Sequence, residues 1–261
     1  MTIGIVGCGN LGFSLLNGIR LKDENVKIIA SKRSIKEFEH LQNSTTLFTV
    51  SNPELIKQSD VIIIALKPYN VLNFLKENKE FFHAEKHTIV SVASGITLSE
   101  MSDELGADFD IFRAMPNTAA SVNESITAIS LKNDHLNREN EIINLFNSLG
   151  ETIVIDEALM ESATILGACG IAYVLRFMRA MIQGGIEVGF DAKTATKIVS
   201  QTVKGAAQLI ITNGTHPEEE IDKVTTPKGC TIVGLNEMEH SGFSSALIKG
   251  IVTSYEKIEK K

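Results

Sequence analysis

Over the first 155 residues, short runs rich in Ile and Val alternate with longer, polar, helix-like stretches. Several of these runs are nearly continuous in β-branched residues, which is typical of strands covered on both faces of a sheet. The intervening stretches have the length of crossover helices, so the sheet is expected to be mostly parallel. The expected strands are Ile3 to Val6, Val26 to Ala30, Val61 to Leu66, Thr88 to Val92, Ile111 to Ala114, Ile126 to Ile129 and Thr152 to Ile155. The expected helices between them are Leu11 to Leu21, Ser34 to Leu41, Val71 to Asn78 and Asn137 to Leu149.

After Asp156 strand-like runs become rare, and the chain is rich in Ala, Ile, Leu, Lys and Glu. Asp191 predicts the N-cap of a helix from Ala192 to about Thr212, which Asn213-Gly214 ends. The stretch from Gly170 to Val188 is apolar on nearly every face, and such a helix is normally buried.

An all-helical half of this size buries such a helix poorly by itself. We therefore infer a homodimer whose helical halves pack together; an ordinary core helix within one chain is the alternative. The expected organisation is an α/β dinucleotide-type domain over residues 1–155 and an all-α domain over residues 156–261.

The composition excludes several classes of function. A net charge of -7 disfavours nucleic acid as the main partner. No uninterrupted apolar run reaches the roughly 20 residues of a membrane span, and the N-terminus has no basic region typical of a signal peptide. The 3 cysteines lack metal-ligand spacing, and His216 and His240 lie too far apart to indicate a metal site. We expect a reduced, cytoplasmic protein without a metal.

The first expected strand is followed at once by Gly7-Cys8-Gly9-Asn10-Leu11-Gly12, which opens the first helix. In this G-x-G-x-x-G pattern, Gly7 and Gly9 allow a tight turn and a close approach of the backbone to a pyrophosphate. Gly12 lets the helix pack against the strand, and the helix N-terminus attracts the anion. The pattern predicts a Rossmann-type dinucleotide site; a purely structural glycine turn is the alternative.

The end of the second expected strand indicates which dinucleotide is bound. NAD-binding units usually carry Asp or Glu here to accept a hydrogen bond from the ribose 2′-OH. This chain has Ser31-Lys32-Arg33-Ser34 instead. Hydroxyls and two cations attract a 2′-phosphate, so NADPH is expected to be preferred over NADH. A solvated basic turn is the alternative.

Three further strands end in small or polar residues at the carboxyl edge, where open α/β sheets bind ligands. We expect these residues to lie along the nicotinamide half of the cofactor. They are Ala65, Leu66, Lys67 and Pro68, then Ala93, Ser94 and Gly95, then Met115, Pro116 and Asn117.

The chain resembles the pyrroline-5-carboxylate reductase family along its whole length. Five motifs carry the likeness, and their order and spacing are more specific than any one of them. They are the Gly7 to Gly12 turn, Ala65-Leu66-Lys67-Pro68, Ser91-Val92-Ala93-Ser94-Gly95-Ile96-Thr97, Arg113-Ala114-Met115-Pro116-Asn117-Thr118 and Val224-Thr225-Thr226-Pro227-Lys228-Gly229-Cys230-Thr231.

This resemblance implies an NADPH-dependent enzyme that reduces 1-pyrroline-5-carboxylate to L-proline, with a helical dimerisation domain and, in some members, larger rings of dimers. It implies that Asn52 helps to hold the adenosine end and that Glu157 lies near the substrate. It also implies that the loop with Thr226, Lys228, Gly229, Cys230 and Thr231 holds the substrate carboxylate at a helix N-terminus.

The sequence departs from the family pattern in three places. Lys228 stands where many relatives have Gly, and Gly167 to Tyr173 replaces a Ser-Gly-Ser-Gly-Pro-Ala-Tyr stretch. Ala119 replaces a Pro. The first two departures put the fine substrate contacts in doubt, whereas the third alters loop rigidity.

The reaction needs position and a proton near the imine nitrogen, but no strong base. We assign the hydroxyl that hydrogen-bonds this nitrogen to Thr231, as an orienting or relaying group. Cys230 has no neighbouring histidine and is not expected to be a nucleophile. Arg113 either forms a buried ion pair or touches the cofactor.

Two other functions stay open at this point. One is reduction of another imine or a β-hydroxyacid with the same cofactor half. The other is an NADP(H)-binding paralogue that acts as a sensor without turnover.

Overall fold

The computed structural model describes residues 1–34 and 36–259, and its elements divide into two compact units. One unit comprises Met1–Cys169 together with the end of the chain from Tyr255, and the other comprises Gly170–Ser254.

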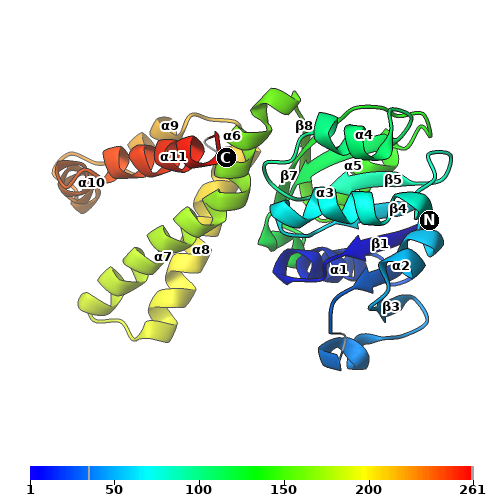
Figure 1. Cartoon of the computed structure of the whole chain (residues 1–261). Helices are drawn as coiled ribbons and strands as arrows, with labels where there is room; N and C mark the ends of the chain where they lie inside the picture. Colours follow the sequence, from blue (N-terminus) through cyan, green and yellow to red (C-terminus); the bar gives the residue numbers. More distant parts are fainter. Residues whose placement is uncertain (35, 260–261) are drawn as a thin grey trace. The chain divides into compact units, whose positions relative to one another are not determined.

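The first unit is built on an 8-stranded sheet with the strand order β3-β2-β1-β4-β5-β6-β7-β8 (Figure 1). All neighbouring strands run parallel except β6 and β7, which confirms the mostly parallel sheet. The strands are β1 (Thr2–Val6), β2 (Lys27–Ser31), β3 (Thr46–Thr49), β4 (Val61–Ile64), β5 (Thr88–Ser91), β6 (Asp110–Met115), β7 (Ser125–Leu131) and β8 (Gly150–Val154).

Helices cover both faces of this sheet. α1 (Asn10–Lys22) and α5 (Glu139–Asn147) contribute Leu16 and Phe146 to the core on one face. On the other face lie α2 (Asn52–Gln58), α3 (Pro68–Glu77) and α4 (Leu98–Leu105). Successive residues of β4 alternate between these two cores, with Ile63 in the first and Ile64 in the second, because side chains of a strand point to opposite faces. The continuous Ile and Val runs are thus explained by burial on both faces.

The expected strands are all present, but β3, α2 and α4 were missed. The predicted helix from Ser34 to Leu41 was wrong in type: Lys36–Leu41 forms a 3-10 helix, and Ile35 lies outside the described residues. Other 3-10 helices span Lys79–Phe81, Thr118–Val122 and Glu157–Leu159. α6 (Met160–Ala163) and a π-helical turn (Thr164–Cys169) follow the last of these.

The second unit is helical, as expected. It contains α7 (Gly170–Glu187), α8 (Ala192–Asn213), α9 (Pro217–Lys223), α10 (Cys230–His240) and most of α11 (Phe243–Glu259). The Asp191 carboxylate accepts hydrogen bonds from the N–H groups of Lys193 and Thr194, which confirms the predicted cap of α8. Gly214 ends that helix in the left-handed conformation.

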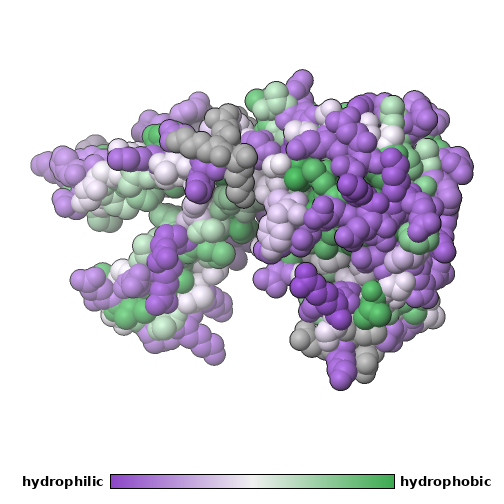
Figure 2. Space-filling view, in the orientation of Figure 1, coloured by the Kyte–Doolittle hydropathy of each residue, from purple (hydrophilic) through white to green (hydrophobic). Residues whose placement is uncertain are grey.

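α7 carries no buried residue, although it is apolar on most faces. Leu175 is 58% exposed and Val174 is 46% exposed. Hydrophobic side chains are visible along the helices of this half in Figure 2. The helical stretch Glu157–Glu187 is also long and apolar enough to cross a membrane by length and composition, with a mean hydropathy of 1.6 and 17% of that window buried. Arg176 and Arg179 interrupt its apolar surface.

Candidate functional site

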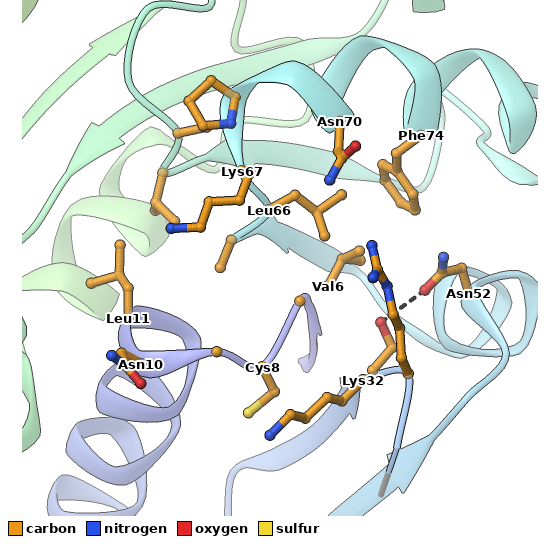
Figure 3. Close-up of a pocket in the computed structure, with 18 of the residues that line it drawn as sticks. Val6, Cys8, Asn10, Leu11, Lys32, Asn52, Leu66, Lys67, Asn70 and Phe74 are labelled. Atoms are coloured by element: carbon orange, nitrogen blue, oxygen red, sulfur yellow. Dashed lines mark hydrogen bonds between the residues drawn. The ribbon is translucent and has the colours of Figure 1, made fainter.

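A cavity of about 1060 Å³ lies at the carboxyl edge of the parallel strands in the first unit (Figure 3). Residues after β1, β2, β4 and β5 line it, together with one face of α3. Parallel strands bring their carboxyl ends to one edge, so residues that are far apart in sequence meet there. Its size suits a small organic ligand or cofactor.

The glycine turn forms one wall of this cavity through Gly7, Gly9, Asn10 and Leu11. Gly7 has φ +87°, and a Cβ added at Gly12 would lie 2.7 Å from the carbonyl oxygen of Gly7, so both positions require glycine. A Cβ added at Gly9 would meet nothing within 4 Å, because it would project into open space.

The first turn of α1 has no side-chain cap and no acidic residue. Its N–H groups are therefore available to an anion, and the helix dipole favours one. This open cradle in front of Gly9 fits the pyrophosphate of a dinucleotide. Gly12 packs behind the turn and does not line the cavity.

Basic and hydroxyl groups follow the glycine turn along the wall. The N–H groups of Gly7 and Cys8 donate to the carbonyl oxygen of Ser31 at 3.1 and 2.9 Å, which ties the turn to the end of β2. Ser31 Oγ donates to Asn52 Oδ1 at 2.8 Å. Lys32 and Arg33 line the same part of the cavity, and Lys32 Nζ lies 4.3 Å from the ring centre of Phe38.

The opposite wall comes from the segment between β4 and α3. Ala65, Leu66, Lys67 and Pro68 all line the cavity, and Pro68 occupies the first turn of α3, where its missing N–H costs nothing. In the segment that follows β5, Ala93 lines the cavity. Gly95, Met115 and Pro116 do not.

Asn117 also lies outside the residues that line the cavity, and its groups are engaged within the protein. Its N–H donates to Ser125 Oγ at 3.0 Å, its Oδ1 accepts from the N–H of Ala119 at 2.9 Å, and its Nδ2 donates to the carbonyl oxygen of Gly167 at 3.1 Å. The next residue, Thr118, lines the cavity instead. Asn117 thus fixes the loop that presents Thr118 and ties it to the π-helical turn.

Arg113 forms the ion pair that was one of its two expected roles. Its side chain is 3% exposed, with Nη1 at 3.0 Å from Glu157 Oε1 and Nη2 at 2.8 Å from Glu161 Oε1. Glu157 Oε1 also accepts the N–H of Leu98, the first residue of α4, at 2.7 Å. Glu157 borders a smaller cavity of about 480 Å³ with Ser99 and Lys132.

Sequence reasoning missed several residues that line the main cavity. Four of them come from α3 at intervals of three and four residues, so they share one helical face. They are Asn70, Asn73, Phe74 and Glu77. This spacing of residues after Pro68 could have indicated a helix face at the ligand edge, but this stretch is predicted only as a crossover helix.

The loop that contains Thr226 and Lys228 lies in the second unit, directly before α10. Gly229 N–H donates to the carbonyl oxygen of Thr226 at 2.9 Å, which closes a turn. A Cβ at Gly229 would lie 2.5 Å from Thr226 Oγ1 and 3.0 Å from the Thr226 carbonyl oxygen, so a larger residue here would displace Thr226. Lys228 has φ +61°, a left-handed conformation that glycine adopts without strain and lysine rarely adopts.

α10 begins at Cys230, its N-cap Gly229 makes no side-chain hydrogen bond, and its first turn has no acidic residue. The N–H groups of this turn, which includes Thr231, are therefore suited to a carboxylate.

Cys8, within the glycine turn, is 1% exposed. Burial raises the pKa of its thiol to about 11, although the positive charge of Lys32 opposes this shift. The thiol therefore stays protonated at neutral pH and is a poor nucleophile.

The doubly covered parallel sheet, the glycine turn and the cavity at the carboxyl edge define a dinucleotide-binding protein of the Rossmann type. Comparison with known families refines this class. Residues 157–261 match the family model "Pyrroline-5-carboxylate reductase dimerisation", and residues 2–95 match "NADP oxidoreductase coenzyme F420-dependent".

Among curated proteins, the chain is 41% identical to pyrroline-5-carboxylate reductase 1 of Dictyostelium discoideum, over 98% of this chain and 49% of the relative, so it spans about half of that protein's length. It is 41% identical to pyrroline-5-carboxylate reductase 2 of the same organism, over 99% of this chain and 92% of the relative.

Among solved structures, the NADP-bound pyrroline carboxylate reductase of Plasmodium falciparum is similar, with a TM-score of 0.89, 25% identity and coverage of 100% and 97% of the two chains. The 1-pyrroline-5-carboxylate reductase of Streptococcus pyogenes has a TM-score of 0.87 and 29% identity, with coverage of 100% and 99%. The chain belongs to the pyrroline-5-carboxylate reductase family.

Proposed function

We propose that the protein catalyses the NADPH-dependent reduction of 1-pyrroline-5-carboxylate to L-proline. The observation that carries this proposal is the cavity of about 1060 Å³, which joins an open glycine cradle to the basic end of β2. Family membership supports the choice of substrate, because the relatives named above are pyrroline-5-carboxylate reductases.

The residues of this cavity fit NADPH. A pyrophosphate matches the open space in front of Gly9 and the free N–H groups at the start of α1. Lys32 and Arg33 suit a 2′-phosphate, since each cation would form a charge-assisted hydrogen bond with it. No carboxylate follows β2 to repel that phosphate, because the chain reads Ser31-Lys32-Arg33-Ser34 there.

When bound, NADPH supplies the hydride that adds to the carbon of the substrate's C=N bond. The protein's own groups hold the substrate and guide a proton to its nitrogen. The first turn of α10 binds the substrate carboxylate, and Lys228 adds a positive charge to this loop. Thr231 hydrogen-bonds the nitrogen and relays a proton that originates in solvent, because a neutral hydroxyl is too weak an acid to lose its own.

We also propose that the functional form is a cytoplasmic homodimer. The exposed apolar surface of α7 supports this assembly, since monomeric proteins rarely leave large apolar patches in water. The match of residues 157–261 to a dimerisation family supports it as well. A reduced compartment suits the 3 free cysteines.

The function is tested by measuring NADPH and NADH oxidation separately with 1-pyrroline-5-carboxylate and identifying the product. We expect L-proline to form and NADPH to be used at lower concentration than NADH. Saturable NADP(H) binding without reduction of any pyrroline carboxylate would contradict the proposal and favour a sensor. Turnover only with another imine or a β-hydroxyacid would replace the substrate but keep the cofactor.

A further inference from the structure

α3 presents a polar face to the main cavity, next to the end that carries Asn52. Asn70, Asn73 and Glu77 line the cavity from this face, together with Phe74. Figure 3 shows Asn70 and Phe74 projecting from α3 toward the part of the cavity where Asn52 lies. The polar groups therefore stand in one row along the cavity.

The polar side chains of this row are available to hydrogen-bond a ligand. Within residues 1–34 and 36–259, the side chains of Asn70, Asn73 and Glu77 make no hydrogen bond or ion pair with another protein group. The neighbouring Asn78 differs, since it is 7% exposed and its Nδ2 donates to the carbonyl oxygen of Phe74 at 2.9 Å. The buried amide is thus satisfied internally, whereas the cavity-facing groups are left for solvent or a ligand.

The position of the row indicates which part of a dinucleotide it would meet. Ser31, hydrogen-bonded to Asn52, and the cations Lys32 and Arg33 mark the ribose and 2′-phosphate of the adenosine half. The nicotinamide half would lie near Ala93 and Thr118, which also line the cavity. The α3 row borders the adenosine half, beyond the ribose, where the base would lie.

We propose that Asn70, Asn73 and Glu77 recognise the adenine base by its exocyclic amine. Adenine offers an amine donor at C6 beside ring-nitrogen acceptors. An amide has both a donor and an acceptor and can pair with both groups, whereas an ionised carboxylate only accepts and selects the amine. Phe74 is mostly buried in the core, but it lines the cavity and would offer an apolar edge to the flat ring between these polar groups.

The same face discriminates against hypoxanthine, which carries an oxygen at C6. That oxygen would stand where the amine donates and would repel the Glu77 carboxylate, since the donor left on that edge of hypoxanthine is the ring N1–H, one position away from C6. This inference rests on the proposed function, because it assumes that the cavity holds NADP(H). It adds a base-reading role for α3 that the glycine turn and the phosphate contacts do not supply.

The test is a binding titration with NADP⁺ and with its hypoxanthine analogue, which carries an oxygen in place of the C6 amine and a proton at N1. We expect the wild-type protein to bind NADP⁺ about tenfold more tightly, the effect of one or two hydrogen bonds. Asn70→Ala should weaken the binding of both dinucleotides about equally and keep this ratio, because an amide can turn over to pair with either base. Glu77→Gln should weaken NADP⁺ and tighten the analogue, because a glutamine amide can donate to the C6 oxygen.

Lys76→Ala is the matched control, since Lys76 is exposed on the same helix and does not line the cavity. This variant should keep the wild-type ratio of affinities for NADP⁺ and its hypoxanthine analogue. Equal affinities of the wild-type protein for the two dinucleotides, or an unchanged ratio of affinities in Glu77→Gln, would overturn this inference. If NADP⁺ still binds and the imine is still reduced, the proposed function stands. Failure of NADP⁺ to bind at all would overturn the proposed function and this inference with it.

Discussion

Arg113 Nη1 lies 3.0 Å from Glu157 Oε1, and this contact joins the middle of β6 to the first residues after β8. Glu161 Oε1 lies 2.8 Å from Nη2, the other terminal nitrogen of the same guanidinium. The cation is thus enclosed by two carboxylates that are themselves 32% and 22% exposed. Removal of the cation leaves two partly buried negative charges facing each other.

Arg113→Met should therefore lower the free energy of unfolding by about 3 kcal/mol, because breaking a buried pair strands its partners. Urea denaturation at neutral pH measures this loss. Lys223→Met is the control: Lys223 is 58% exposed and pairs with Glu220 at 2.7 Å, so it should cost less than about 1 kcal/mol. Equal losses in the two variants would show that the Arg113 cluster behaves like a surface pair.

His87 makes stability depend on pH in the acid range. Burial lowers the pKa of its ring to about 4, with help from the charges of Lys86 and His83. The unfolded chain binds this proton below its ordinary pKa of about 6.5, whereas the folded protein takes it up only near the lowered pKa. Stability should fall by about 2–3 kcal/mol as the pH drops between these two values.

His87→Gln keeps an acceptor for the N–H of His83 and removes the titration, so its stability should change less over this interval. Chemical denaturation at several pH values measures both slopes. His240→Gln, at an exposed position, should retain the wild-type slope. The same slope in His87→Gln would assign the acid sensitivity to other groups.

Gly9 and Gly12 should respond to alanine in opposite ways. At Gly9 the added methyl group meets no protein atom, so Gly9→Ala should keep wild-type stability but lose at least about tenfold in NADPH affinity by obstructing the pyrophosphate. At Gly12 the methyl group would lie 2.7 Å from the Gly7 carbonyl oxygen, so Gly12→Ala should unfold more easily. Thermal unfolding and NADPH titration of both variants separate the two effects. If Gly9→Ala bound NADPH with wild-type affinity, the pyrophosphate could not lie in front of Gly9.

Lys32→Ala combined with Arg33→Ala should raise KM for NADPH by about tenfold or more and leave KM for NADH nearly unchanged. The reason is that only NADPH carries the 2′-phosphate that these cations would bind. Steady-state assays with each cofactor check this difference. Parallel increases for both cofactors would indicate a general electrostatic effect of the cations instead of recognition of the phosphate.

Thr231→Ala should lower kcat by about tenfold, the effect of one lost hydrogen bond in the transition state. NADPH binding should stay close to the wild-type value, because Thr231 is assigned to the imine. Thr231→Ser retains the hydroxyl and should recover most of the activity. A variant that loses turnover and NADPH affinity equally would contradict the assignment of Thr231 to the substrate.

The parts of the fold that could be predicted from the sequence are those with strong local patterns. The runs around Ile62 and Val90 are apolar because both faces of their strands are covered. β3 was missed because it is only half buried, whereas β4, which is also 4 residues long, is buried throughout and therefore apolar throughout. The reversal of β7 relative to β6 leaves no trace in the sequence, since a doubly covered antiparallel strand has the same composition as a parallel one.

Some residues of the candidate site could likewise be predicted from the sequence, and others could not. The cavity residues that directly follow strands, such as Ser31 and Lys67, were identified because strand ends define the ligand edge. The α3 face was missed because a helix side reveals its partner only after packing. Likewise, the bond between Asn117 and Gly167 joins residues 50 positions apart, and no local pattern indicates it.

The raised pKa of Cys8 has a consequence for how this protein would meet oxidative stress. A buried, protonated thiol reacts slowly with peroxides and alkylating agents, so the turn that faces the cofactor should be spared damage. Cys230, which is exposed, is the more accessible target. Among the three cysteines, oxidation should therefore begin at Cys230 at the start of α10, and Cys8 in the glycine turn should react last.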